Sequence, residues 1–149
     1  MPKESTEPIY IGCELIVRKD DQILLGLRKN HFGAGTWGLP GGHLEFSERL
    51  VDTACREAKE EIGLDIQPSD LHLISVVDGV PTSSGQQHHV HVTFELREPA
   101  QEPRNTEPEF CEELRYFPLD ALPENILPTH QPIIENYVAN RLYKYISNN

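Results

Sequence analysis

The fold is decided by one stretch, which reads Gly41-Gly42-His43-Leu44-Glu45-Phe46-Ser47-Glu48, then Arg49 to Cys55, then Arg56-Glu57-Ala58-Lys59-Glu60-Glu61-Ile62-Gly63-Leu64. A glycine turn leads into a helix that has a signal at each end. Ser47 is a good N-cap before the helical pattern, and Gly63 is a residue type that ends helices. Apolar residues recur at spacings of three and four, which predicts a buried stripe. The stripe consists of Val51, Ala54, Cys55, Ala58 and Ile62.

Three glutamates lie on the other side of this predicted helix. At about 100° per residue, Glu57, Glu60 and Glu61 fall within roughly a third of the circumference. Carboxylates crowded in this way repel one another, so the helix carries a cost. A solvated face keeps that cost low, whereas a hard divalent cation held by oxygen ligands would offset it. The run Leu39-Pro40-Gly41-Gly42 favours the cation, because a sharply bent backbone can expose carbonyl oxygens beside the helix.

The spacing of this stretch resembles the Nudix box of the Nudix (MutT-like) hydrolases. Gly42, five residues, Glu48, seven residues and the run from Arg56 to Leu64 meet every fixed position of that box, which spans residues 42–64. Ala58 stands where the family more often has a larger aliphatic residue. The wider run from 25 to 117 is similar to the subgroup that cleaves nucleoside triphosphates. The resemblance implies an α/β protein with the Nudix fold, an α/β/α sandwich with a mixed central sheet, in one domain over residues 1–149.

The resemblance also implies roles for the residues of the box. Glu60 and Glu61 would be the main metal ligands, and the carbonyl oxygen of Gly41 would be another. Glu57 would be a ligand or the base that activates water, and the sequence does not decide which glutamate is the base. Two further residues would orient these catalytic groups, namely Arg56 and Glu48.

Candidate substrate contacts lie outside the box. Arg28 matches the position at which the family supplies a basic side chain to the substrate phosphates, although by itself it reads as a solvated strand end. Glu109 matches the loop glutamate that approaches the metals, with Glu107 as the alternative. Phe32 and Trp37 flank a glycine-rich loop, where core packing is the default and the border of a base pocket is the alternative.

Periodicity predicts the remaining elements. Strands are expected at 9–17, 22–27, 71–80, 87–97 and 112–117, with a polar, proline-containing loop at 98–108. A second helix is expected at 132–146, covering the face of the sheet opposite the box helix. Pro132 suits its first turn. Its buried side would consist of Ile133, Ile134, Tyr137, Val138, Leu142, Tyr145 and Ile146.

Three histidines cluster in one predicted strand. His89 and His91 alternate onto one face, and His88 points to the other. Two ligands on a face are too few for a structural zinc site, and no Cys or His follows at a finger-like spacing. We therefore expect His91 to lie near the substrate, because neighbouring strands line the ligand cleft in the fold that the resemblance implies.

Composition limits the function classes. The chain has 149 residues, of which 38% are hydrophobic and 25% charged, and its formal net charge is −11. This charge disfavours nucleic-acid binding, which needs clustered Lys and Arg. No apolar run approaches the length of a membrane span, so no membrane partner is expected. The three cysteines are far apart and odd in number, which predicts reduced thiols and a cytoplasmic location.

Together these observations predict a magnesium-dependent nucleotide pyrophosphatase, with Mn²⁺ as a substitute for Mg²⁺. The expected reaction converts a nucleoside triphosphate to nucleoside monophosphate and pyrophosphate. The alternative within the same hydrolase class is another nucleoside diphosphate derivative, such as a nucleotide sugar or ADP-ribose. A non-catalytic ligand-binding module on the same fold is disfavoured, since the box glutamates are retained. The partner is a nucleotide, and the sequence leaves a homodimer, the base, the sugar and any preference for modified nucleotides open.

Overall fold

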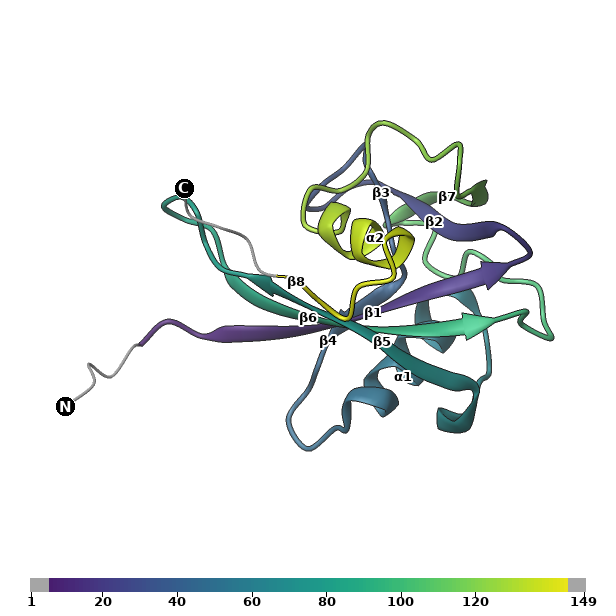
Figure 1. The fold of residues 1–149 in the computed structure, drawn as a ribbon, viewed down its shortest axis with the longest axis horizontal. Coiled ribbons are helices and arrows are strands. Elements are labelled where there is room, and N and C mark those ends of the chain that lie inside the picture. Colours follow the sequence, from purple (N-terminus) through teal and green to yellow (C-terminus); the bar gives the residue numbers. More distant parts are fainter. Residues whose placement is uncertain (1–5, 145–149) are drawn as a thin grey trace.

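The computed structural model describes residues 6–144 and has one mixed sheet at its centre (Figure 1). The sheet order is β3-β2-β1-β6-β5-β8, and in addition β4 pairs with β1 and β7 pairs with β2. The β1–β6 and β5–β8 pairs are parallel and the others are antiparallel. The strands are β1 Ile9–Lys19, β2 Gln22–Arg28, β3 Trp37–Gly38, β4 Gly41–His43, β5 Leu71–Gly79, β6 His88–Arg97, β7 Cys111–Pro118 and β8 Tyr143–Lys144.

The five long strands confirm the prediction to within a few residues at their ends. The short strands β3, β4 and β8 were not predicted, because two or three residues carry no measurable periodicity. A single turn of 3₁₀-helix, η1 (Pro68–Asp70), leads into β5. In the part of the chain that the structure describes, no helix is long and apolar enough to cross a membrane.

The box helix, α1, spans Leu50–Ile62, so its start differs from the prediction. Ser47 is not its N-cap: Arg49 occupies that position without a side-chain cap, and Ser47 has a left-handed φ of 67°. A turn thus separates Ser47 from the helix. The predicted end is correct, because Gly63 adopts φ 67° and its N–H donates to the carbonyl of Ala58.

The second helix, α2, spans Gln131–Val138 and is shorter than predicted. Asn140 takes a left-handed φ of 53°, and the N–H of Arg141 donates to the carbonyl of Asn136, which closes the helix end. The chain then adds β8 to β5 (Figure 1), and the hydroxyl of Tyr143 donates to the Asp78 carboxylate. Val138 and Leu142, predicted to be buried, are therefore exposed, and Tyr145 and Ile146 lie outside the described residues.

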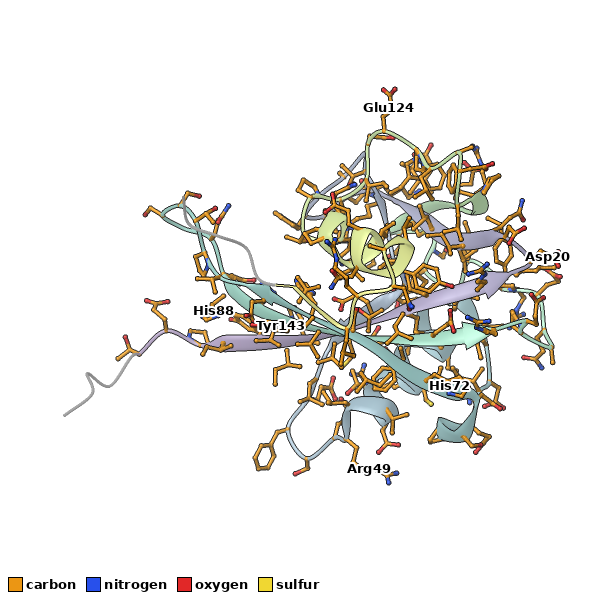
Figure 2. The ribbon with its side chains drawn as sticks, in the orientation of Figure 1. Asp20, Arg49, His72, His88, Glu124 and Tyr143 are labelled. Atoms are coloured by element: carbon orange, nitrogen blue, oxygen red, sulfur yellow. The ribbon has the colours of Figure 1, made fainter. Side chains whose placement is uncertain are left out.

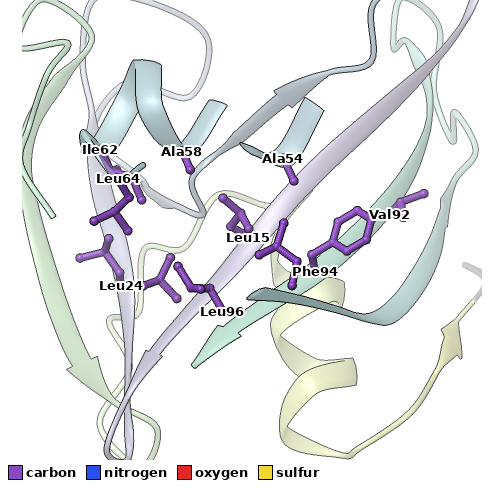
Figure 3. Packing of buried hydrophobic residues seen from close by; sticks show 11 residues of the cluster. Leu15, Leu24, Ala54, Ala58, Ile62, Leu64, Val92, Phe94 and Leu96 are labelled. Atoms are coloured by element: carbon purple, nitrogen blue, oxygen red, sulfur yellow. The ribbon is translucent and has the colours of Figure 1, made fainter. Parts of the chain in front are cut away.

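The core has two parts, one on each face of the sheet. Leu15 and Val17 of β1 pack against α1, whose apolar stripe lies over this cluster (Figure 3). Ile16, between them, points to the other face and packs with Ile133 and Ile134 of α2. The helices thus cover opposite faces, as predicted, and β1 is buried from both sides. In the apolar stripe of α1, three residues are fully buried and two are partly buried. The buried ones are Ala54, Ala58 and Ile62, and the partly buried ones are Val51 and Cys55.

Candidate active site

Glu57 projects from α1 onto the glycine strand β4. Glu57 is only 9% exposed. A Cβ added at Gly42 would lie 2.2 Å from its Oε1, so a side chain at position 42 would occupy the space of the carboxylate. The second glycine of the turn therefore makes room for the first glutamate of the helix.

Arg56 holds the acidic side chains around it. Its Nε donates to Glu48 at 2.8 Å, and its Nη1 donates to Glu57 at 2.8 Å and to Glu60 at 3.3 Å. Its Nη2 also donates to the backbone carbonyl of His43 at 3.2 Å. The hydrogen bonds from Arg56 lower the pKa of the Glu48 carboxyl to about 2. These are the contacts of a residue that orients carboxylates.

Glu61 is the electrostatically strained member of the cluster. Burial, followed by the charge of Glu57, raises the pKa of its carboxyl to about 9. Glu61 also shares a hydrogen bond with Glu57, and its Oε2 accepts a weak one from the N–H of Gly41 at 3.3 Å. At neutral pH, Glu61 therefore carries a proton. A bound cation could take the place of this proton and neutralise the charges of Glu57 and Glu61.

The donor chemistry of the cluster fits a hard divalent ion. Glu57, Glu60 and Glu61 supply carboxylate oxygens, and the backbone of Gly41 lies next to Glu61, to which its N–H donates. Within residues 6–144, no three His, Cys, Asp or Glu side chains already converge as a metal site. In the present contacts, the positive charge beside Glu57 and Glu60 comes from Arg56. A metal would replace these contacts.

A small cavity of about 70 Å³ opens beside Glu61. Arg28 lines it at the end of β2, and burial lowers the pKa of its guanidinium, which nonetheless stays charged at neutral pH. Its Nε donates to the carbonyl of Phe32 at 2.9 Å, and among the described residues its other guanidinium nitrogens have no hydrogen-bond partner. A cation with free donors thus lines the same cavity as Glu61.

Glu107, rather than Glu109, lines this cavity. Burial and the charges of Glu57 and Glu60 raise the pKa of the Glu107 carboxyl. Glu109 is exposed, and its backbone carbonyl accepts a hydrogen bond from Asn30. Of the two glutamates, Glu107 is therefore the one that lies in the same cavity as Glu61.

The other predicted substrate contacts are scattered. Trp37 is 7% exposed and packs edge-on against Phe117 in the core, whereas Phe32 is 75% exposed. His91 is buried, and its Nδ1 bonds a carboxylate of β1, Glu14, at 2.7 Å. None of the three is among the described residues that line the cavity.

Sequence reasoning missed two buried polar residues beside the site. Glu14 is 4% exposed, and its Oε2 has no hydrogen-bond partner among the described residues. The Nδ1 of His130 accepts from the N–H of Leu39 at 3.0 Å, and burial lowers its pKa to about 4. The signal for Glu14 was its position as the sole charged residue in the apolar run 9–17. Nothing local marked His130.

The NUDIX domain profile matches residues 9–137. An ADP-ribose pyrophosphatase of Methanocaldococcus jannaschii is 32% identical over 128 residues, 86% of this chain and 72% of that protein. A mouse oxidized purine nucleoside triphosphate hydrolase is 32% identical over 99 residues, and the match spans 54% of this chain and 62% of that enzyme. The crystal structure of a MutT NUDIX hydrolase from Burkholderia pseudomallei superposes with a TM-score of 0.78 at 34% identity, over 87% of this chain and 98% of that one.

Proposed function

The chain belongs to the Nudix hydrolases, which act on nucleotide derivatives, and from this premise we propose that it cleaves nucleoside triphosphates to nucleoside monophosphate and pyrophosphate. The observation that carries the proposal is the cavity between Arg28 and Glu61. Arg28, with free donors, lines it together with Glu61, whose pKa is raised by burial and by the charge of Glu57. A polyphosphate accompanied by cations complements both sides.

The residues of the chain divide the work in this proposal. Arg28 binds a phosphate and fixes the nucleoside end of the substrate. Glu57 or Glu61 accepts the proton of the attacking water, and of the two Glu61 is the one among the described residues that line the cavity. Arg56 keeps Glu48, Glu57 and Glu60 in place through the hydrogen bonds described above.

We propose Mg²⁺ as the physiological ion, with Mn²⁺ as a substitute. Glu57, Glu60, Glu61 and the Gly41 carbonyl would hold it, because Mg²⁺ takes oxygen ligands and substrate phosphate. When bound, it would stabilise charge on the phosphoryl oxygens and acidify water. The raised pKa of Glu61 supports this assignment, since crowded carboxylates are stabilised by a cation.

The identity of the products tests the proposed reaction. A panel of nucleoside triphosphates, nucleotide sugars and dinucleotides is incubated with Mg²⁺, and the products are separated by chromatography. We expect monophosphate and pyrophosphate from a triphosphate. Turnover in ¹⁸O-water should label one of these two products and so identify the phosphorus that is attacked. Release of nucleoside diphosphate with inorganic phosphate would refute the proposal.

A second candidate is hydrolysis of ADP-ribose or a nucleotide sugar. The Methanocaldococcus relative favours it, because that protein is an ADP-ribose pyrophosphatase and matches 86% of this chain. The mouse relative favours the triphosphate. The box residues would bind a diphosphate group in both kinds of substrate. A comparison of kcat/KM across the panel therefore decides between triphosphates and ADP-ribose or nucleotide sugars.

Arg28→Ala should raise KM and lower kcat/KM by roughly one to two orders of magnitude. A charge-assisted phosphate contact contributes about 1.5–3 kcal/mol, which corresponds to that range. Lys29→Ala is the matched control, because Lys29 is the adjacent basic residue and is not among the described residues that line the cavity. An unchanged kcat/KM in Arg28→Ala would leave Arg28 as a solvated strand end.

Glu107→Gln and Glu109→Gln form a second matched pair. We expect Glu107→Gln to lower kcat about tenfold or more, since its carboxyl senses Glu57 and Glu60, and Glu109→Gln to have less effect. If the loop glutamate meets the metals only with substrate bound, Mg²⁺ affinity of the free enzyme, measured by calorimetry, should stay nearly constant in both variants. A larger loss in Glu109→Gln would assign the role to Glu109.

We further propose a reducing, cytoplasmic location. The cysteines Cys13, Cys55 and Cys111 are free thiols, and burial raises the pKa of each one. Unreactive, unpaired thiols are typical of proteins that are not exposed to oxidising conditions.

A further inference from the structure

Two histidines from different strands meet on the side of the sheet away from α1. His43 ends β4 and is exposed, and His89 lies near the start of β6 and is partly buried. Their Nε2 atoms are 3.1 Å apart. Nitrogen lone pairs this close need either a shared proton or a shared cation between them.

The pair is held by three strands. Tyr10 of β1 stacks on His43 with ring centroids 5.2 Å apart and on His89 with centroids 5.4 Å apart. Backbone pairing fixes the strands, since Gly12 lies opposite His43 and Tyr10 lies opposite His89. The imidazoles are therefore positioned by rigid elements, which is a requirement of a preorganised metal site.

The ring of His89 has its other nitrogen engaged. The backbone of Gln87 hydrogen-bonds this ring. Because Nε2 faces His43, the bond to Gln87 uses Nδ1, and it leaves the Nε2 lone pair free in the neutral ring. Metal-binding histidines commonly donate the N–H of their second ring nitrogen to a backbone carbonyl, which fixes the orientation of the ring. Burial also lowers the pKa of His89, so the ring is neutral at physiological pH.

We propose that His43 and His89 form a second cation site, for a transition-metal ion that prefers nitrogen ligands, such as Cu²⁺ or Zn²⁺. With metal–nitrogen distances of about 2.0–2.1 Å, two neighbouring ligands stand about 2.9–3.4 Å apart, and the observed separation falls in this range. The ion would replace the proton that now lies between the two Nε2 atoms. Imidazole selects Cu²⁺ and Zn²⁺ over Mg²⁺, so the site differs from the carboxylate cluster in its chemistry.

The site offers two protein ligands, and water completes the coordination. The stacked neighbour His91 has its Nδ1 committed to Glu14, and within residues 6–144 no group of three potential ligands is formed. His43 also follows the glycine turn directly, and its carbonyl accepts a hydrogen bond from Arg56. An ion on this pair would thus join β6 to β4, the strand that carries Gly41 and Gly42.

The test is Cu²⁺ binding to the untagged full chain in saturating Mg²⁺, which occupies the carboxylates. We expect one Cu²⁺ per chain, with hyperfine splitting from two imidazole nitrogens in the electron paramagnetic resonance spectrum. His43→Gln and His89→Gln should each weaken Cu²⁺ binding about tenfold or more. Each variant is first checked for the thermal unfolding midpoint of the wild-type chain.

The matched control is His72→Gln. His72 is an exposed histidine of β5 at the far end of the sheet from His88 (Figure 2), and its loss should leave Cu²⁺ binding unchanged. A measurement on the unaltered chain guards against variants that fold poorly: substoichiometric Cu²⁺ should broaden the imidazole NMR signals of His43 and His89 before that of His72. Equal Cu²⁺ affinity in all three variants, a spectrum with fewer than two nitrogens, or earlier broadening of His72 would overturn the proposal.

Discussion

Replacing Glu61 by glutamine should lower kcat by about three orders of magnitude and abolish most Mg²⁺ binding to the free enzyme. The substitution keeps the shape of the side chain and removes the charge that a cation needs. Loss of a ligand that stabilises transition-state charge costs several kcal/mol, and about 4 kcal/mol corresponds to that factor. Titration calorimetry measures the binding and product chromatography the turnover.

The same variant should make the metal-free protein more stable at neutral pH. The pKa of Glu61 is raised to about 9, from an ordinary value of 4.5. Below about pH 4.5 the carboxyl is protonated in both the folded and the unfolded chain, and it contributes no difference. Between about pH 4.5 and 9 the folded chain holds a proton that the unfolded chain releases, so the free energy of unfolding falls as pH rises. Glutamine has no proton to lose, so this part of the pH dependence should disappear.

Metal binding should also release a proton in the wild-type chain, because Mg²⁺ takes the carboxylate form of Glu61. Calorimetry in buffers of different ionisation enthalpy counts that proton. The control is Glu124→Gln, an exposed glutamate at the edge of the molecule remote from α1 (Figure 2). Mg²⁺ affinity that is equal in Glu61→Gln and wild type would remove Glu61 from the metal site.

Gly42→Ala should lower kcat about a hundredfold while the fold remains intact. The new methyl group would lie 2.2 Å from Oε1 of Glu57, so the carboxylate must move. A side-chain end can swing away at little cost in stability, whereas a displacement of about 1 Å at a reacting group can cost about a hundredfold in rate. We therefore expect an unfolding midpoint within a few degrees of the wild type.

Gly41→Ala is the contrasting variant. Gly41 has φ 153°, and an added Cβ would lie 2.4 Å from the carbonyl oxygen of Cys13 and 2.8 Å from Cα of Glu14. Both atoms belong to the backbone of β1 and cannot swing away, so this variant should lose about 1–3 kcal/mol of stability as well as activity. Two results would contradict this role of Gly42: a loss of stability in Gly42→Ala as large as in Gly41→Ala, or a full kcat in Gly42→Ala. Either would mean that Gly42 is not needed to make room for the Glu57 carboxylate.

The sequence by itself determined the elements whose signals are local. The helix face with Glu57, Glu60 and Glu61 follows from spacings of three and four, and its end follows from Gly63. The long strands follow from alternation and from turn residues between them. Such signals involve neighbours along the chain, so they survive without knowledge of the fold. The predicted C-terminal turns of α2 show where local signals fail. The apolar spacing continues past Val138, but the left-handed Asn140 ends the helix and the chain after it pairs with β5 as β8.

Tertiary structure alone decided which groups meet from distant parts of the chain. Glu107 reaches the cavity because the loop before β7 is tied to the end of α1, where Arg104 N–H donates to the carbonyl of Ile62 and Thr106 bonds Glu60. Neither contact has a sequence signature, so the sequence favoured Glu109 and kept Glu107 as the alternative. The raised pKa of Glu61 likewise required burial, because desolvation is its largest cause and depends on every element packed around Glu61.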